Sequence, residues 1–213
     1  MYVSFWFVEF NCLRGLYMEE LLEFINSIHK IDVETEDAVR KYFVYESFKK
    51  NEFLTEKDRI CKKTYFILSG LVRRYYINEN GKDNTVWIYF DNQLVTDVGS
   101  YFSQKPSLGY LQACDPTRVL SLSFENEQKL LAYPEFLQFH LKLIRSLLVA
   151  VIAFHQNYKL MNAQEKYAYL MANFPEMIQK SKLKHIATLL NVSPETLSRI
   201  RAAFVDVMSN KDY

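Results

Sequence analysis

The residues best suited to chemistry lie near the C-terminus, in the segment 186–201, which reads IATLLNVSPETLSRIR. If the second half of this segment is a helix, Glu195, Ser198 and Arg199 lie at i, i+3 and i+4 and share one face. In the major groove of DNA an arginine pairs with guanine, and a carboxylate accepts from the cytosine amino group. The methyl group of Ala202, on the same face, suits thymine. This face therefore predicts that the helix reads DNA bases.

The elements that must hold this face form the pattern of a helix-turn-helix. Asn191 falls in the turn, where asparagine tolerates the left-handed conformation. Ser193 is a good N-cap and Pro194 suits the first helical position, so the second helix begins here. Two helices joined by any turn would share part of this pattern, but its combination with the small Ala187 in the first helix is restrictive. The predicted DNA-binding residues are Ser193, Pro194, Glu195, Thr196, Ser198, Arg199, Arg201, Lys182 and Lys184.

Charge along the chain supports this prediction. The whole chain of 213 residues has a formal net charge of only +1. Between residues 180 and 201, however, five Lys or Arg side chains stand against the single acid Glu195, which gives +4. Lys182, Lys184 and Arg201 are placed to bind phosphates, which set the position on the duplex without reading its sequence.

Upstream of this motif, short strand patterns separated by turn signals predict a β-sandwich or β-roll. Ser69-Gly70 and Asn80-Gly81 mark the turns before and after one of these strands. Strands are predicted over 65–68, 71–77, 85–90, 108–113 and 118–123, after helices over 18–29 and 35–43. Alternation within 85–90 places Val86, Ile88 and Phe90 on one face, and Thr85, Trp87 and Tyr89 on the other.

A long helix is predicted after Pro134, because apolar residues recur there at alternating spacings of four and three. The heptad positions, which form the predicted dimerisation seam, are Leu137, Leu141, Ile144, Leu148, Val151, His155 and Tyr158. The seam either packs on the chain's own β-domain or pairs with a second copy of the helix. We favour pairing, because one small β-domain does not cover so wide an apolar surface.

Four segments follow from these patterns. They are an N-terminal extension over 1–17, with Met18 as the predicted natural start, a sensory β-domain over 18–132, a dimerisation helix over 133–160, and a helix-turn-helix domain over 161–213. A further helix is expected over 163–172, ending at Phe174-Pro175.

Other classes of function find little support in the sequence. The three cysteines are widely spaced and odd in number, which predicts a reducing cytoplasm rather than disulfides. The longest uncharged apolar run, 146–154, is too short to cross a bilayer, so no membrane partner is expected. No nucleophile–base pair, phosphate-binding glycine loop or metal-spaced cluster is recognisable, so we expect neither an enzyme nor a metal or cofactor.

Several motifs resemble the cyclic-AMP receptor and fumarate-nitrate regulator (Crp/Fnr) family. They are VSPETLSRIR at 192–201, YFILSGLVR at 65–73, Asn80-Gly81-Lys82 and Pro134-Glu135-Phe136. The resemblance covers about 18–204 and implies an α+β protein with an N-terminal cyclic-nucleotide-binding-type β-roll, a long dimerisation helix and a C-terminal winged helix-turn-helix. It places Glu195 and Arg199 on the family's base-reading glutamate and arginine. Pro194 stands where some members carry another arginine, so the same operator sequence is not implied.

The resemblance fails at the family's nucleotide site. Cyclic-nucleotide binders carry a glutamate for the ribose and an arginine–serine pair for the cyclic phosphate. Here Asp97 lies near the glutamate position, and Ser107 and Leu108 stand where the arginine and serine are expected. Without the guanidinium the phosphate has no bidentate partner, so we expect a subgroup in which cyclic AMP is not the effector. The candidate effector pocket comprises Asp97, Val98, Gly99, Ser107 and Leu108.

Two questions stay open from the sequence. The β-domain either binds another small molecule or serves only as a folded platform. The leading prediction is a homodimeric regulator of transcription that binds a pseudo-palindromic operator in double-stranded DNA, with RNA polymerase as a further candidate partner. The alternative is a ligand-binding or protein-interaction module without sequence-specific DNA binding.

Overall fold

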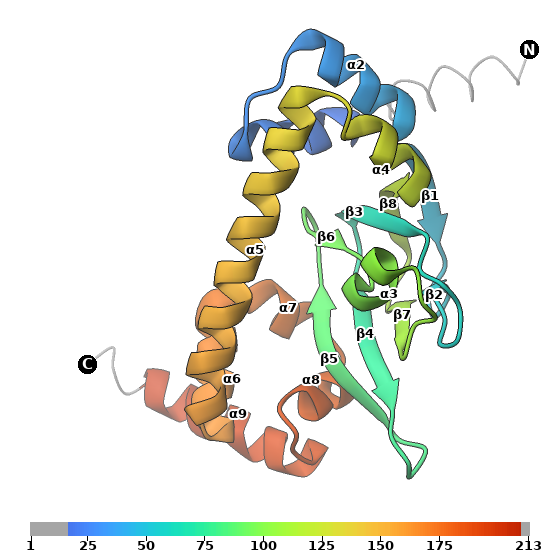
Figure 1. Cartoon of the computed structure of the whole chain (residues 1–213). Coiled ribbons are helices and arrows are strands. Elements are labelled where there is room, and N and C mark those ends of the chain that lie inside the picture. Colours follow the sequence, from blue (N-terminus) through green and yellow to red (C-terminus); the bar gives the residue numbers. More distant parts are fainter. Residues whose placement is uncertain (1–16, 210–213) are drawn as a thin grey trace, which may run out of the picture.

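The computed structural model describes residues 17–209, with side chains described up to Phe204. The predicted extension 1–17 therefore lies outside the described residues except for Tyr17, and the predicted start at Met18 stays a prediction. Figure 1 shows a β-domain on one side of a long helix, with the C-terminal helices at the far end of both.

The β-domain consists of two four-stranded sheets between short helices. A helix covers residues 17–28 and is followed by α2 (Val33–Tyr42). One sheet has the order β1-β8-β3-β6 and the other the order β2-β7-β4-β5. The strands are β1 (Val44–Phe48), β2 (Phe53–Thr55), β3 (Lys63–Ser69), β4 (Val72–Ile77), β5 (Asp83–Tyr89), β6 (Leu94–Val95), β7 (Tyr110–Ala113) and β8 (Thr117–Ser123). The short helix α3 (Val98–Ser103) precedes β7, and α4 (Phe124–Leu130) follows β8.

Gly70 makes the tight connection between β3 and β4. Its φ of +120° lies in the region that side chains other than glycine rarely adopt. A Cβ at this position would also stand 2.5 Å from Oγ1 of Thr117. Only glycine therefore allows the β3–β4 connection to pack against the start of β8.

Strand β5 departs from the simple alternation expected for 85–90. Arg74 pairs with Trp87 and Tyr75 pairs with Thr85, so Val86 is an extra residue in a β-bulge. The bulge reverses the expected side of Thr85. This residue now shares with Ile88 the face that the C-terminal helices cover, and the prediction that these two residues lie on opposite faces is wrong.

The helical half begins with α5 (Pro134–Leu160), which has 27 residues. It is followed by α6 (Ala163–Asn173), α7 (Pro175–Lys180), α8 (Leu183–Leu189) and α9 (Pro194–Ser209). These bounds confirm a long helix after Pro134, a helix over 163–172 and the break before Pro175, while the division into domains stays a prediction. The resemblance also implied a wing, but within residues 17–209 no strand follows β8.

Candidate nucleic-acid interface and sensory site

The turn between α8 and α9 has the geometry expected of a helix-turn-helix. Asn191 has a φ of 57°, in the left-handed region. The backbone N–H of Val192 donates to the carbonyl of Ala187 at 3.0 Å, and Ala187 is fully buried where the two helices meet. The hydroxyl oxygen of Ser193 accepts from the N–H of Thr196 at 3.2 Å, so Ser193 caps α9.

Helix α9 separates an inner from an outer face. Leu197 and Ile200 are buried against α8 and α6, whereas Glu195, Ser198 and Arg199 are exposed. Hydrogen bonding from Ser193 lowers the pKa of the Glu195 carboxyl, and the nearby Arg199 acts in the same direction. The outer face therefore presents an ionised acceptor beside a guanidinium.

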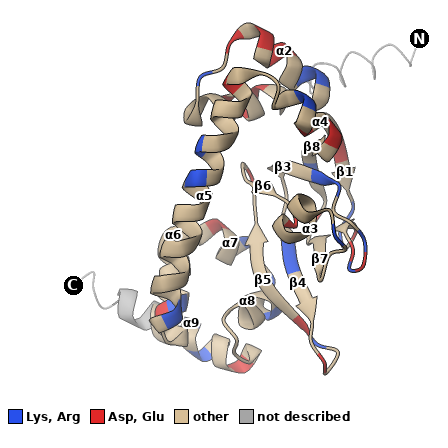
Figure 2. Ribbon diagram, in the orientation of Figure 1, with Lys and Arg blue, Asp and Glu red and all other residues tan. Residues whose placement is uncertain are grey.

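The predicted phosphate contacts lie on the same end of the molecule. Lys182, Lys184 and Arg201 are exposed, and none of them, nor Arg199, takes part in an ion pair within the described part of the chain. Lys180 differs, because its ammonium group binds Asp91 at 3.1 Å and also Glu176. Four of the five cations in 180–201 are thus free to meet phosphates (Figure 2).

The five residues predicted to form an effector pocket divide into two groups. Asp97 and Ser107 are buried, and the Ser107 hydroxyl donates to a carboxylate oxygen of Asp97 at 2.5 Å. The other oxygen of Asp97 accepts from Nη2 of Arg74 at 3.1 Å. Val98, Gly99 and Leu108 are exposed on the surface instead. Two of the five residues are therefore buried and three are exposed, and the effector pocket stays a prediction.

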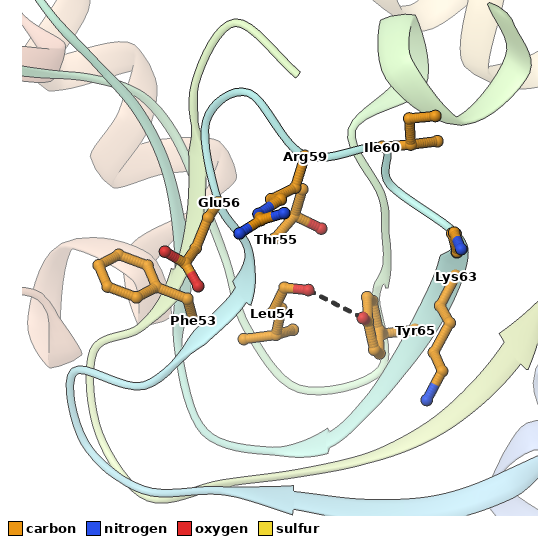
Figure 3. Close-up of a pocket in the computed structure, with 9 residues that line it drawn as sticks. Phe53, Leu54, Thr55, Glu56, Arg59, Ile60, Lys63 and Tyr65 are labelled. Carbon is orange, nitrogen blue, oxygen red and sulfur yellow. Dashed lines mark hydrogen bonds between the residues drawn. The ribbon is translucent and has the colours of Figure 1, made fainter. Parts of the chain in front are cut away.

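A hollow of about 250 Å³ lies elsewhere in the β-domain, between β2, β3 and the loop that joins them (Figure 3). It is lined by Phe53, Leu54, Thr55, Glu56, Arg59, Ile60, Lys62, Lys63 and Tyr65. The Tyr65 hydroxyl, at its wall, donates to the carbonyl of Leu54 at 3.0 Å. None of the five predicted effector residues lines this hollow.

The predicted dimerisation seam is exposed over most of α5. Leu137, Leu141 and Ile144 are 37–39 % exposed, and exposure rises to 57 % at Leu148 and 63 % at Val151. His155 is also exposed, but Tyr158 is half-buried. Its ring stacks on Phe154, with 4.6 Å between the centroids, and it packs against the helix-turn-helix core. Tyr158 therefore packs within its own chain, where the heptad pattern predicted a dimer contact.

By length and composition alone, α5 could also cross a membrane: its most apolar window has a mean hydropathy of 1.6, and only 11 % of that window is buried. The sequence prediction considered only the uncharged run 146–154, which is shorter than the apolar part of α5. An exposed apolar helix that pairs with a second copy has the same composition, so this observation is weak evidence for a membrane span.

Three polar side chains that the sequence did not single out lie in the interior of the molecule, namely Arg73, Arg74 and His185. Arg73 and His185 are buried and bind each other across the boundary between the β-domain and α8. The signal was available, because two consecutive arginines interrupt the otherwise apolar and aromatic strand VRRYYI. A charged side chain in such a strand is seldom buried without a partner.

Comparisons with known proteins agree with this architecture. The family model described as "Cyclic nucleotide-binding domain" matches residues 45–133. A comparison with curated protein sequences finds no match. Among solved structures, FixK2 from Bradyrhizobium japonicum is similar with a TM-score of 0.64 and 16 % identity, covering 77 % of this chain and 85 % of that one. The structure of a CooA mutant from Carboxydothermus hydrogenoformans is similar with a TM-score of 0.61 and 18 % identity, covering 78 % of each chain. The "c-di-GMP Responsive Global Regulator CLP" of Xanthomonas campestris is similar with a TM-score of 0.59 and 14 % identity, covering 82 % of this chain and 92 % of that one.

Proposed function

We propose that this chain, which contains a cyclic-nucleotide-binding-type domain over 45–133 and has the fold of the Crp/Fnr regulators, is a homodimeric DNA-binding regulator of transcription. The observation that carries the proposal is the outer face of α9. Glu195, Ser198 and Arg199 are exposed there on a helix whose opposite face is buried in the helix-turn-helix core. Exposed donors and acceptors on a rigidly held helix are what base reading in the major groove requires.

Dimerisation is part of the proposal because one helix offers only a few base contacts, each worth about 1–3 kcal/mol. The exposed apolar residues of α5, from Leu137 to Val151, supply a surface for a second copy. An apolar surface of this extent is seldom left open to water. Two copies would present two reading faces to half-sites about one helical turn of DNA apart, roughly 34 Å.

The proposal assigns no cyclic AMP to the β-domain. The family's phosphate-binding arginine is replaced here by Ser107, whose hydroxyl is already bound to Asp97. Double-stranded DNA and a second copy are the proposed partners, while a different small-molecule effector and RNA polymerase remain predictions. The buried thiols Cys61 and Cys114 are free, which fits work in the reducing cytoplasm.

Selection of operators from a library of random duplex DNA tests the proposal. We expect the purified chain to enrich a sequence with two inverted half-sites, and its affinity to fall steeply as salt rises, because phosphate contacts release counterions. If no sequence is enriched and binding does not depend on salt, the alternative stands, a ligand-binding or protein-interaction module. In that case α9 and α8 form a protein-binding surface.

A further inference from the structure

The C-terminal helices pack directly against the β4–β5 hairpin. Helix α8 lies beside β5, and α7 lies close to the same strand (Figure 1). Leu71, Ile88 and Cys114 of the β-domain belong to the same buried cluster as Ile186 and Ala187 of α8. The helix-turn-helix therefore shares a core with the β-domain and is held by more than the end of α5.

A buried polar junction lies at this boundary. Arg73 of β4 is 6 % exposed and His185 of α8 is 5 % exposed. One guanidinium nitrogen of Arg73, Nη1, donates to Asp83 at 2.7 Å and to Nδ1 of His185 at 2.9 Å. Nε and Nη2 donate to the side-chain oxygen of Gln112 at 3.2 and 2.9 Å. Arg73 thus links two neighbouring strands to α8.

The protonation state of His185 follows from this geometry. A guanidinium has no acceptor, so Nδ1 of His185 must carry the lone pair that receives the hydrogen bond from Arg73. Burial lowers the pKa of His185 to about 4, and the charge of Arg73 acts in the same direction. The imidazole is therefore neutral near pH 7, and the junction is intact under ordinary conditions.

A second hydrogen bond fixes the far end of α8. The backbone N–H of Thr85 donates to Oγ1 of Thr188 at 3.2 Å. Strand β5 is an edge of its sheet, so the backbone N–H of Thr85 has no partner strand on the side of α8 and can make this contact. The first helix of the motif is thus attached to the hairpin near its start by His185 and near its end by Thr188.

We propose that Arg73 is a positioning residue for DNA recognition: through His185 it fixes α8, and with it α9, on the β4–β5 hairpin, so that the dimer accepts one spacing between half-sites. This inference rests on the proposed function. The reading face itself does not touch Arg73. Its direction relative to α5 is nevertheless set by how α8 is seated, because Ala187 and Leu197 pack α9 onto α8.

The adjacent arginine provides a matched control. Arg74 points to the opposite face of β4, where it binds Asp97 at 3.1 Å and the hydroxyl of Tyr76 at 2.5 Å. Among the described side chains it makes no hydrogen bond or ion pair with α8 or α9, although it is also largely buried, with 20 % of its side chain exposed. Loss of Arg74 therefore perturbs the β-domain without touching the junction.

The test compares wild type, Arg73→Met and Arg74→Met on the selected half-site, arranged as inverted repeats whose central spacer differs by one base pair at a time. We expect wild type and Arg74→Met to bind one spacer at least tenfold more tightly than the spacers two base pairs longer or shorter. We expect Arg73→Met to prefer any spacer by less than threefold, while it keeps the same half-site sequence. A general loss of stability would lower affinity for every spacer equally, so it cannot mimic this result.

Two variants of His185 make the test independent of whether Arg73→Met folds. His185→Leu removes the acceptor and should lose the spacer preference, whereas His185→Gln offers a side-chain oxygen and should retain most of it. The inference is overturned if Arg73→Met or His185→Leu keeps the wild-type preference, or if the wild type itself binds all spacers alike. Failure of the proposed function looks different, because the wild type would then select no half-site at all.

Discussion

The polar groups at the two ends of the molecule are used in opposite ways. On α9, Glu195 and Arg199 point outward, and Arg199 has no ion-pair partner in the described chain. Inside the β-domain, Arg74 and Ser107 both bind the carboxylate of Asp97. A charge that is already paired and buried must lose its partner before it meets a ligand, and this costs several kcal/mol. The difference fits the proposed function: the exposed charges of α9 are available to a partner, whereas the charges inside the β-domain are already neutralised by one another.

The largest effect on DNA affinity is expected from substitutions in the proposed dimer interface of α5. The double substitution Ile144→Glu with Leu148→Glu places two carboxylates on each seam of α5, so the dimer should dissociate. The monomer keeps only one half-site and should lose more than about 3 kcal/mol of binding free energy, over a hundredfold in affinity. Sedimentation analysis gives the oligomeric state and a gel shift the affinity. Glu substitutions at the exposed Val33 and Val44, outside the seam, serve as the control. A dimer that persists in the seam variant would show that α5 is not the interface.

The paired interior of the β-domain is tested by Asp97→Ala. This change leaves the largely buried guanidinium of Arg74 without its carboxylate and removes the acceptor of the Ser107 hydroxyl. We expect the free energy of unfolding to fall by about 3 kcal/mol, measured by urea denaturation. DNA affinity of the folded protein should change little. Glu19→Ala, which breaks an exposed ion pair with Arg40, should cost less than about 1 kcal/mol. Equal losses in the two variants would contradict the contrast between paired interior and free surface.

The junction between the two regions predicts a dependence of stability on pH. Burial lowers the pKa of His185 to about 4 in the folded protein, from the ordinary 6.5 of a histidine, so the unfolded chain binds the proton more tightly. Stability therefore decreases as pH falls through the interval from 6.5 to 4. Between pH 7 and pH 5 the expected loss from this group is about 2 kcal/mol. Thermal or urea unfolding of wild type and His185→Gln at both pH values isolates the loss of stability that comes from His185, because the variant should lack it. A parallel decline of both proteins would assign the dependence to other groups.

The smallest effect concerns a phosphate contact. Lys184→Ala should weaken binding to every duplex by less than about 1 kcal/mol and reduce the slope of log affinity against log salt by about 1 per subunit. Lys180→Ala is the matched control, since Lys180 is held by Asp91 and Glu176. It should leave the salt slope unchanged. If the salt slope changed equally in both variants, the ion pairs of Lys180 would not keep it from contacting phosphates.

Periodicity and capping predicted the parts of this molecule that depend on local sequence. The bounds of α5 and α6, the turn at Asn191, the N-cap at Ser193 and most strands of the β-roll agree with their predictions. The short elements α3, α4 and α7 were not predicted, because six or seven residues show too little of a helical period and none of these elements belongs to a recognisable motif, as the equally short α8 does. The bulge at Val86 was also missed, since a bulge is defined by the register of the partner strand and leaves no period of its own.

The predicted sites show the same division. The exposed face of α9 follows from spacing alone, because its inner and outer residues alternate on one helix. The Arg74–Asp97–Ser107 cluster joins three segments distant in sequence, and the Arg73–His185 contact joins residues 112 positions apart. Which side chains meet in such clusters depends on tertiary packing. The sequence therefore singled out Asp97 and Ser107, but it did not predict that both would be bound within a buried cluster that includes Arg74.

The most direct measurement is a mutant cycle between the protein and its operator. The affinities of wild type and Arg199→Ala are measured for the selected operator and for a version in which the contacted guanine of each half-site is replaced. We predict that the base change costs the wild type about 1–3 kcal/mol per half-site and costs Arg199→Ala almost nothing, because the side chain that reads that base is gone. If the base change costs both proteins the same, α9 does not read DNA through Arg199, and the central claim fails.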